Sequence, residues 1–189
     1  DIAVAMVASG KGILAADESS GTIKKRFDTI NLTSTEETRR DYREMLFRSE
    51  EAMKNYISGV ILYDETIRQK AKDGTPLTDL IRNAGAIAGI KVDAGAKPLA
   101  GFPGETITEG LDGLRERLNE YYGLGARFAK WRAVIAIANG VPTWGAIKQN
   151  AQALARYAAL CQEANIVPIV EPEVLMDGNP GDHSIDTCY

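Results

Sequence analysis

Short apolar runs alternate along the chain with longer stretches in which apolar residues recur at helical spacing. The runs have the length and composition of buried strands, and they cover residues 12–17, 57–64, 87–93, 127–135 and 166–174. Regular alternation of strands and helices predicts an α/β protein with a parallel sheet, either an open doubly wound sheet or a (β/α)₈ TIM barrel. The open sheet often carries a GxGxxG turn after its first strand. This sequence has none there, which favours the barrel.

The stretches between the runs have the apolar periodicity of amphipathic helices. Helices are expected at residues 2–8, 33–56, 75–85, 107–122 and 150–165. The second of these helices should begin with a capping box from Ser34 to Glu37. Gly85 is placed where it can end the third helix.

Charged residues gather where the predicted strands end, and most come in pairs spaced two residues apart. These residues are Asp17, Lys91 and Asp93, Lys130 and Arg132, and Glu171 and Glu173. Residues two apart in a strand lie on the same face, and the carboxyl ends of barrel strands meet in a central mouth. A solvated edge strand would explain any one pair, but not the repetition. We therefore expect the carboxylates to be buried among cations that neutralise them.

This inventory favours acid–base chemistry on a phosphorylated carbonyl compound. Carboxylates among cations can be tuned so that one donates a proton and another accepts it. A lysine beside other cations has a lowered pKa, so that its neutral amine can attack a carbonyl. Hydroxyl groups of Ser19, Ser20 and Thr22 follow the first strand and suit a phosphate group.

A metal site is disfavoured, and no cofactor is expected. The sequence has one histidine, His183, which excludes a multi-histidine zinc site within this chain. Carboxylates at the strand ends could hold Mg²⁺, but Lys91, Lys130 and Arg132 would compete with the ion.

Overall composition excludes several classes of protein. The 189 residues are 44% hydrophobic and carry a formal net charge of −4, which argues against a nucleic-acid-binding protein. Neither a signal peptide nor an apolar run near the ~20 residues that span a bilayer is visible, so no membrane association is expected. The two cysteines lack a CxxC spacing and are expected to be reduced thiols in a cytoplasmic protein. The chain begins at Asp1 without a methionine, which leaves a removed targeting segment open.

Several motifs together resemble the class I, Schiff-base-forming fructose-1,6-bisphosphate aldolases over essentially the whole chain. They are ILAADESSGTIKKR, GIKVDAGAKPLAG, GLDGLRER, ARFAKWR, LARYA and VPIVEPEV, in the family's order and spacing. The resemblance implies a (β/α)₈ barrel of which residues 1–189 form one incomplete domain with about the first five strand–helix units. It also implies a glycolytic and gluconeogenic lyase, without a cofactor and commonly a homotetramer. Such an enzyme reversibly cleaves fructose 1,6-bisphosphate to dihydroxyacetone phosphate and glyceraldehyde 3-phosphate.

The resemblance implies a catalytic role for the charged strand ends. Asp17 matches the acid–base aspartate near the scissile carbon–carbon bond. Glu171 matches the residue that accepts and donates protons during Schiff-base formation, and Glu173 matches its partner glutamate. Lys130 matches a lysine whose charge supports the transition state, with Arg132 beside it in the charge network.

Other positions match the family's contacts to substrate phosphate groups. These are Ser19, Thr22, Arg26 and Lys91, while Arg39 matches a further substrate-linked basic position. Thr22 stands where relatives often have serine, which keeps the hydroxyl group. From the pattern alone, Thr22 and Arg26 could equally cap and decorate the following helix.

The family's imine-forming lysine lies on a sixth strand, beyond Tyr189. Strand–helix units here average roughly 40 residues, so eight would need on the order of 300, and the residues shown are expected to be inactive by themselves. Asp93 is assigned to the charge network only. Two alternatives stay open: a phosphosugar barrel enzyme that forms no imine, and a non-catalytic piece that binds phosphosugars or a protein.

Overall fold

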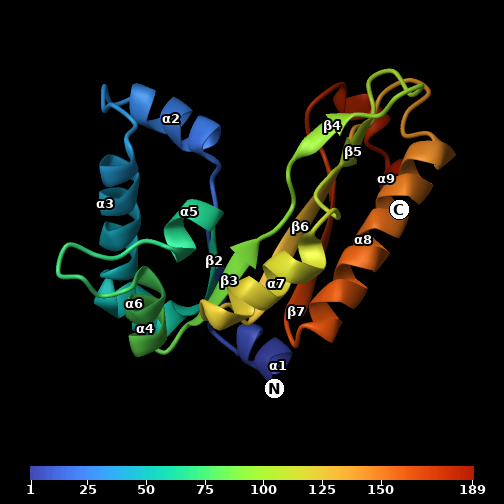
Figure 1. Ribbon diagram of the computed structural model, residues 1–189. Helices are drawn as coiled ribbons and strands as arrows, with labels where there is room; N and C mark the ends of the chain where they lie inside the picture. Colours follow the sequence, from blue (N-terminus) through green and yellow to red (C-terminus); the bar gives the residue numbers. More distant parts are fainter.

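The computed structural model describes residues 1–189, apart from the side chain of Pro180. Its main feature is a curled parallel sheet of five strands in the order β1-β2-β3-β6-β7 (Figure 1). The strands are β1 Gly12–Ala16, β2 Ile57–Leu62, β3 Ile87–Lys91, β6 Phe128–Ile135 and β7 Val167–Val174. All of the predicted strand segments are confirmed. Because neighbours in the sheet follow one another along the chain, the topology is that of consecutive strands in a (β/α)₈ barrel.

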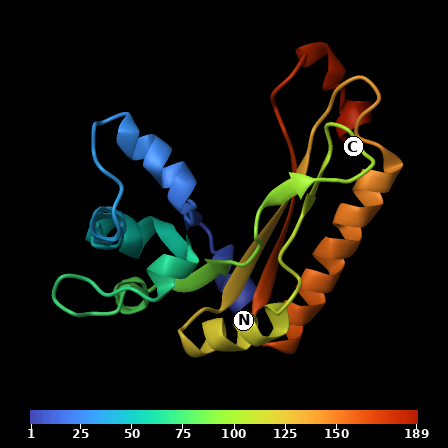
Figure 2. The same ribbon diagram turned by 45° about the horizontal axis from the view of Figure 1, so that its top comes forward.

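Helices connect the strands, as the alternating pattern predicts. They are α1 Ile2–Met6, α2 Ser20–Asp28, α3 Glu36–Phe47, α4 Glu50–Tyr56, α5 Asp64–Ile67, α6 Leu77–Asn83, α7 Leu114–Gly123, α8 Trp144–Glu163 and α9 Ile185–Cys188, with a short 3₁₀ turn, η1, at Pro180–Asp182. Helices α2 to α6 stand apart from α8, with the strands between them (Figure 2). Across the described residues, every helix is too short or too polar to cross a bilayer.

The predicted helix at residues 33–56 is two helices, α3 and α4. The capping box also lies one residue later than expected: the Thr35 hydroxyl accepts from the Thr38 amide at 3.1 Å, and the Thr38 hydroxyl accepts from the Thr35 amide at 2.9 Å. Between the two helices, the Ser49 hydroxyl donates to the Met45 carbonyl at 3.1 Å. Such side-chain bonding competes with the helical backbone and favours a new start.

The segment predicted as a helix from residue 107 begins as a strand. Strands β4, Ala96–Pro98, and β5, Thr106–Thr108, form an antiparallel hairpin, and α7 starts only at Leu114. Gly110 explains the change of direction, since it has a φ of 131° and a Cβ there would lie 2.9 Å from the Ala94 amide nitrogen. The hairpin lies beside the carboxyl half of β6 (Figure 1).

The two faces of the sheet bury different clusters. The outer face packs against the helices in the main core, with Trp131 and Tyr157 among its largest members. The inner face holds a smaller cluster of Met6, Ile61 and Phe128.

Helix α1 closes the end of the sheet where the strands begin (Figure 1). The Ser58 hydroxyl fixes this helix by donating to the Met6 carbonyl at 2.6 Å.

The ring of Phe128 packs in the inner layer next to Lys130, against glycines of the neighbouring strands. Ile61, Gly89, Phe128 and Val167 are neighbours in register across four strands, so their side-chain positions share one layer. Gly89 is required there, because a Cβ would lie 2.3 Å from ring carbons of Phe128. The next layer on the same face contains Lys130, two residues further along β6.

Candidate active site

Three charged residues from three strands meet in one contact group. The Lys130 Nζ atom lies 3.1 Å from Asp17 Oδ2 and 3.5 Å from Glu171 Oε2. Asp17 follows β1, Lys130 lies in β6 and Glu171 lies in β7. In the sheet Lys130 is opposite Ile169. Glu171 lies two residues further along β7, on the same face, and its side chain reaches Lys130 diagonally. The predicted convergence of acidic and basic residues is therefore confirmed, although Lys130 and Glu171 lie inside β6 and β7 rather than at their ends.

The charges of Asp17 and Glu171 keep Lys130 protonated. Burial, the largest single effect, lowers the pKa of Lys130, but the attraction of Asp17 and Glu171 with their hydrogen bonds outweighs it, and the net result is a raised pKa. The expectation that neighbouring cations lower the pKa of a clustered lysine is thus wrong for Lys130. At neutral pH this residue is an ammonium group that stabilises negative charge, rather than a neutral amine that attacks a carbonyl.

A second ion pair lies nearer the mouth of the sheet. Arg132 Nε donates to Glu173 Oε2, and this hydrogen bond lowers the pKa of Glu173 and raises that of Arg132. Both side chains are about 40% exposed, at 39% and 40%. The predicted pairing of the β7 glutamates with cations of the neighbouring strand is confirmed for both glutamates.

Lys91 and Asp93 extend the charged group along the end of β3. The Lys91 Nζ atom lies 3.6 Å from Asp93 Oδ1, and the Asp93 side chain is only 2% exposed. Lys91 is opposite Lys130 in the sheet, so the two cations are neighbours that each face a carboxylate of their own. Asp93 also accepts from the Arg132 amide at 3.3 Å through its other oxygen, which agrees with its predicted place in the charge network.

The first of the residues predicted to contact a substrate phosphate, Ser19, lies two residues after Asp17. Ser19 is the N-cap of α2: its hydroxyl accepts from the Thr22 amide at 3.4 Å and lies 3.1 Å from the Thr22 hydroxyl. The exposed guanidinium of Arg26, two turns along α2, is paired with Glu18. The cap of this helix is therefore Ser19 rather than Thr22, whose amide is bonded by the Ser19 hydroxyl. The polar groups lie at a helix N-terminus beside the charged strand ends, which is a favourable place for an anion.

Arg39 belongs to a different cluster, behind the end of β1. Its guanidinium donates to both carboxylate oxygens of Glu65, at 2.6 and 2.8 Å. One turn later on α3, the fully buried Arg43 donates to the Glu18 carbonyl at 2.6 Å, next to Asp17. Sequence analysis missed Arg43. Its only signal was an arginine four residues after Arg39, on a face that also carries apolar residues.

Potential metal ligands do not cluster within the described part of the chain: no three histidine, cysteine, aspartate or glutamate side chains lie close enough together to hold a metal ion. The single histidine, His183, lies in a loop after β7, with Nε2 2.9 Å from the Leu175 carbonyl oxygen.

Comparison with known proteins agrees with this architecture. The model of the family described as fructose-bisphosphate aldolase class-I matches residues 1–189. A protein named probable fructose-bisphosphate aldolase class 1, from Xanthomonas campestris pv. campestris, is 62% identical over 189 residues, covering 100% of this chain and 55% of that protein. The fructose-bisphosphate aldolase of Dictyostelium discoideum is 56% identical over 179 residues, covering 94% of this chain and 50% of that protein. The chain thus spans about half the length of the curated relatives it matches.

A solved structure shares the fold. It is described as a ternary co-crystal structure of fructose-bisphosphate aldolase from Plasmodium falciparum in complex with TRAP and a small-molecule inhibitor. It matches with a TM-score of 0.91 and 50% identity, covering 99% of this chain and 53% of that one. The match supports the expected fold class, a TIM barrel of which this chain supplies about the first five strand–helix units. The chain belongs to the class I fructose-bisphosphate aldolase family.

Proposed function

We propose that the full-length protein containing this chain is a fructose-bisphosphate aldolase that works through a lysine Schiff base. It would cleave fructose 1,6-bisphosphate reversibly to dihydroxyacetone phosphate and glyceraldehyde 3-phosphate, with the imine-forming lysine outside residues 1–189. The observation that carries the proposal is the contact of Lys130 with both Asp17 and Glu171 in a member of this family. The resemblance further supports a full-length protein that is a glycolytic, cytoplasmic homotetramer. Residues 1–189 by themselves are proposed to be inactive.

In this proposal the two carboxylates handle different protons. Glu171 serves imine formation, which requires a proton for the oxygen that leaves the substrate carbonyl as water. Asp17 accepts the proton of the hydroxyl group on the carbon that becomes the aldehyde. The carbon–carbon bond then breaks, and its electron pair passes to the protonated imine. Lys130 stays protonated between the two carboxylates, at 3.1 and 3.5 Å, and stabilises negative charge on either of them.

The same proposal assigns substrate phosphate binding to the rim of the site. Ser19 and Thr22 offer hydroxyl groups at the start of α2, and Arg26 and Lys91 offer positive charge. Arg39 stays a prediction, because its guanidinium is already bound by Glu65 and a substrate group would compete with that carboxylate.

Reductive trapping tests the proposal on the full-length protein. Sodium borohydride added with dihydroxyacetone phosphate should inactivate the enzyme irreversibly and add the reduced ligand to one lysine, since only an imine is reduced to a stable adduct. Cleavage of fructose 1,6-bisphosphate should be insensitive to EDTA. Turnover without an adduct would favour a phosphosugar enzyme that forms no imine, and phosphosugar binding without turnover would favour the non-catalytic alternative.

Replacing Glu171 by glutamine tests its assigned role. The variant should form the imine about 10²-fold more slowly, because general acid–base catalysis typically contributes that much or more. Rapid-quench borohydride trapping measures the rate. Glu163→Gln is the matched control, since Glu163 is an exposed residue of α8 that pairs only with Arg115 among the described contacts. Near-normal imine formation in the Glu171 variant would refute its role.

A further inference from the structure

The backbone of β6 continues past the end of its neighbour β3. The Val92 amide donates to the Lys130 carbonyl at 3.1 Å, and the ladder between these strands ends there. The peptide groups of Arg132, on the same edge of β6, are bonded by side chains instead. The Arg132 amide donates to Asp93 Oδ2 at 3.3 Å, and the Arg132 carbonyl accepts from the Thr108 hydroxyl at 2.7 Å. These two side-chain hydrogen bonds take the place of the backbone hydrogen bonds that β6 would receive if β3 were longer.

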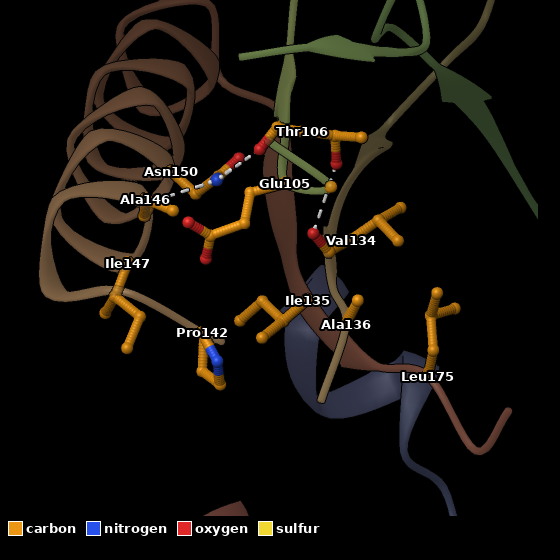
Figure 3. Close-up of a pocket in the computed structure, with 11 residues that line it drawn as sticks. Glu105, Thr106, Val134, Ile135, Ala136, Pro142, Ala146, Ile147, Asn150 and Leu175 are labelled. Carbon is orange, nitrogen blue, oxygen red and sulfur yellow. Dashed lines mark hydrogen bonds between the residues drawn. The ribbon is translucent and has the colours of Figure 1, made fainter. Parts of the chain in front are cut away.

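Thr108 is held firmly by the structure around it. The residue is 2% exposed, and its amide donates to Asn150 Oδ1 of α8 at 3.4 Å. Asn150 Nδ2 donates in turn to the Thr106 carbonyl at 2.9 Å, and the Thr106 hydroxyl donates to the Val134 carbonyl at 3.3 Å (Figure 3). Strand β5 is therefore bonded to β6 on one side and to α8 on the other.

The start of α8 is fixed to the same hairpin. Glu105, only 6% exposed, accepts from the Thr143 amide at 2.7 Å and from the Thr143 hydroxyl at 2.6 Å. Thr143 is also the N-cap of α8. Figure 3 shows Glu105 and Asn150 on adjacent sides of a cavity of about 90 Å³ between the hairpin, β6 and α8. Buried, fully bonded polar groups of this kind hold backbone segments in one arrangement.

We propose that Thr108 is a positioning residue for the aldolase reaction, an inference that rests on the proposed function. Its hydroxyl fixes the Arg132 peptide, and that peptide sets the direction of two side chains: the guanidinium that binds Glu173 and, two residues earlier, the Lys130 ammonium. Thr108 itself lies on the outer hairpin and acts only through β6. Misplacement of a catalytic group by about 1 Å can cost on the order of 10²-fold in rate.

The test compares three variants of the full-length protein. Thr108→Val keeps the shape and removes the hydroxyl, and Thr108→Ser keeps the hydroxyl. Thr66→Val is the matched control, because the Thr66 hydroxyl is fully buried and lacks a hydrogen-bond partner among the described residues. We expect Thr108→Val to lower kcat about tenfold or more with KM within about twofold, while Thr108→Ser and Thr66→Val stay within about threefold of wild type.

Two further measurements separate positioning from folding and from the proposed function. Rates are divided by the number of sites that borohydride traps, so that misfolded protein does not count as slow enzyme. Hydrogen exchange of the Ala133 amide, which belongs to the same peptide group as the Arg132 carbonyl, should be faster in Thr108→Val than in wild type and reports on that peptide group without any substrate. An inactive wild-type protein would overturn the proposed function, and with it the catalytic consequence of Thr108, while exchange would still reveal whether the hydroxyl holds the peptide.

With an active wild-type protein, three outcomes would overturn the positioning role. One is an unchanged kcat per trapped site in Thr108→Val. Another is a loss that serine does not restore, because the hydroxyl is the group that is claimed to act. The last is an equal loss in Thr66→Val, which would show that any change to a buried threonine has the same effect.

Discussion

Replacing Lys130 by methionine removes the one positive charge that contacts both Asp17 and Glu171. The substitution keeps an unbranched side chain that is one atom shorter, and it leaves two carboxylates facing each other across the position of the ammonium. The Lys130 and Asp17 side chains are 14% and 10% exposed, so water compensates only in part. We expect the full-length variant to be much less stable than wild type, as well as catalytically impaired.

The size of the loss follows from the two distances. With an effective dielectric constant of about 20, unit charges at 3.1 and 3.5 Å attract by about 5 kcal/mol each. The net loss is smaller than this attraction, because the variant no longer has the free-energy cost of burying the ammonium. Removing one partner of a buried ion pair typically costs about 3–5 kcal/mol. Glu171 is 31% exposed, which places the expected loss near the lower limit, at about 3 kcal/mol.

Urea unfolding of the full-length protein at neutral pH measures this quantity. Lys97→Met is the matched control, because Lys97 is an exposed residue of β4 and its loss should change the free energy of unfolding by no more than about 0.5 kcal/mol. The pKa of Lys130 is raised in the folded state, so its stabilisation is fully present below the ordinary value of 10.5 and is lost as pH rises through the folded-state pKa. The difference between wild type and variant should therefore persist from neutral pH to about 10.5 and shrink above it.

Two results would refute this reasoning. A free energy of unfolding within about 0.5 kcal/mol of wild type would show that the ammonium and the carboxylates do not stabilise one another. A loss of the expected size that is the same with both Asp17 replaced by asparagine and Glu171 replaced by glutamine would show that the stability comes from the lysine stem instead, because interacting residues must give a coupling energy in a mutant cycle.

Four other substitutions test the fold and the second ion pair. Gly89→Ala should destabilise the protein by about 1–3 kcal/mol or more in urea unfolding, and Phe128→Leu should recover part of that loss; simple addition of the two losses would contradict the packing argument. Because the hydrogen bond from Arg132 lowers the pKa of Glu173, this carboxylate stabilises the fold above its unfolded pKa, near 4.5, and the benefit is lost as pH falls through the folded-state value. The advantage of wild type over Glu173→Gln in thermal midpoint should thus disappear in acid, and an equal advantage at pH 3 and pH 7 would disprove it. Thr35→Ala should cost about 1 kcal/mol of unfolding free energy by removing the α3 cap, and an unchanged urea midpoint would rule the cap out.

The sheet and the charged centre could be predicted because their signals are local and repeated. A strand buried on both faces reads as an apolar run, and charges spaced two apart at its end must share a face. Given a parallel barrel, the carboxyl ends must also converge. These rules alone bring Asp17, Lys130 and Glu171 together, which the structure confirms.

The parts that were missed depend on contacts between distant segments. Strands β4 and β5 have three residues each, too few for a periodic pattern. Ile107 of β5 continues the apolar spacing of Leu114 and Leu118 in α7, so the helix was predicted to begin too early. The direction of the Lys130 pKa shift depends on which charges surround the ammonium, which no spacing reveals. Thr108 looks like an ordinary hairpin residue until the hairpin is folded against β6.

The aromatic ring beneath the charged residues has a practical meaning for redesign. Phe128 occupies space that side chains at Gly59 and Gly89 would otherwise share, since a Cβ at either glycine would lie within 2.9 Å of it. One side chain of β6 thus occupies the space beside glycines of two neighbouring strands. Shortening Phe128 should open space in the layer next to Lys130, and the two glycines offer positions at which new side chains could then fill or line that space.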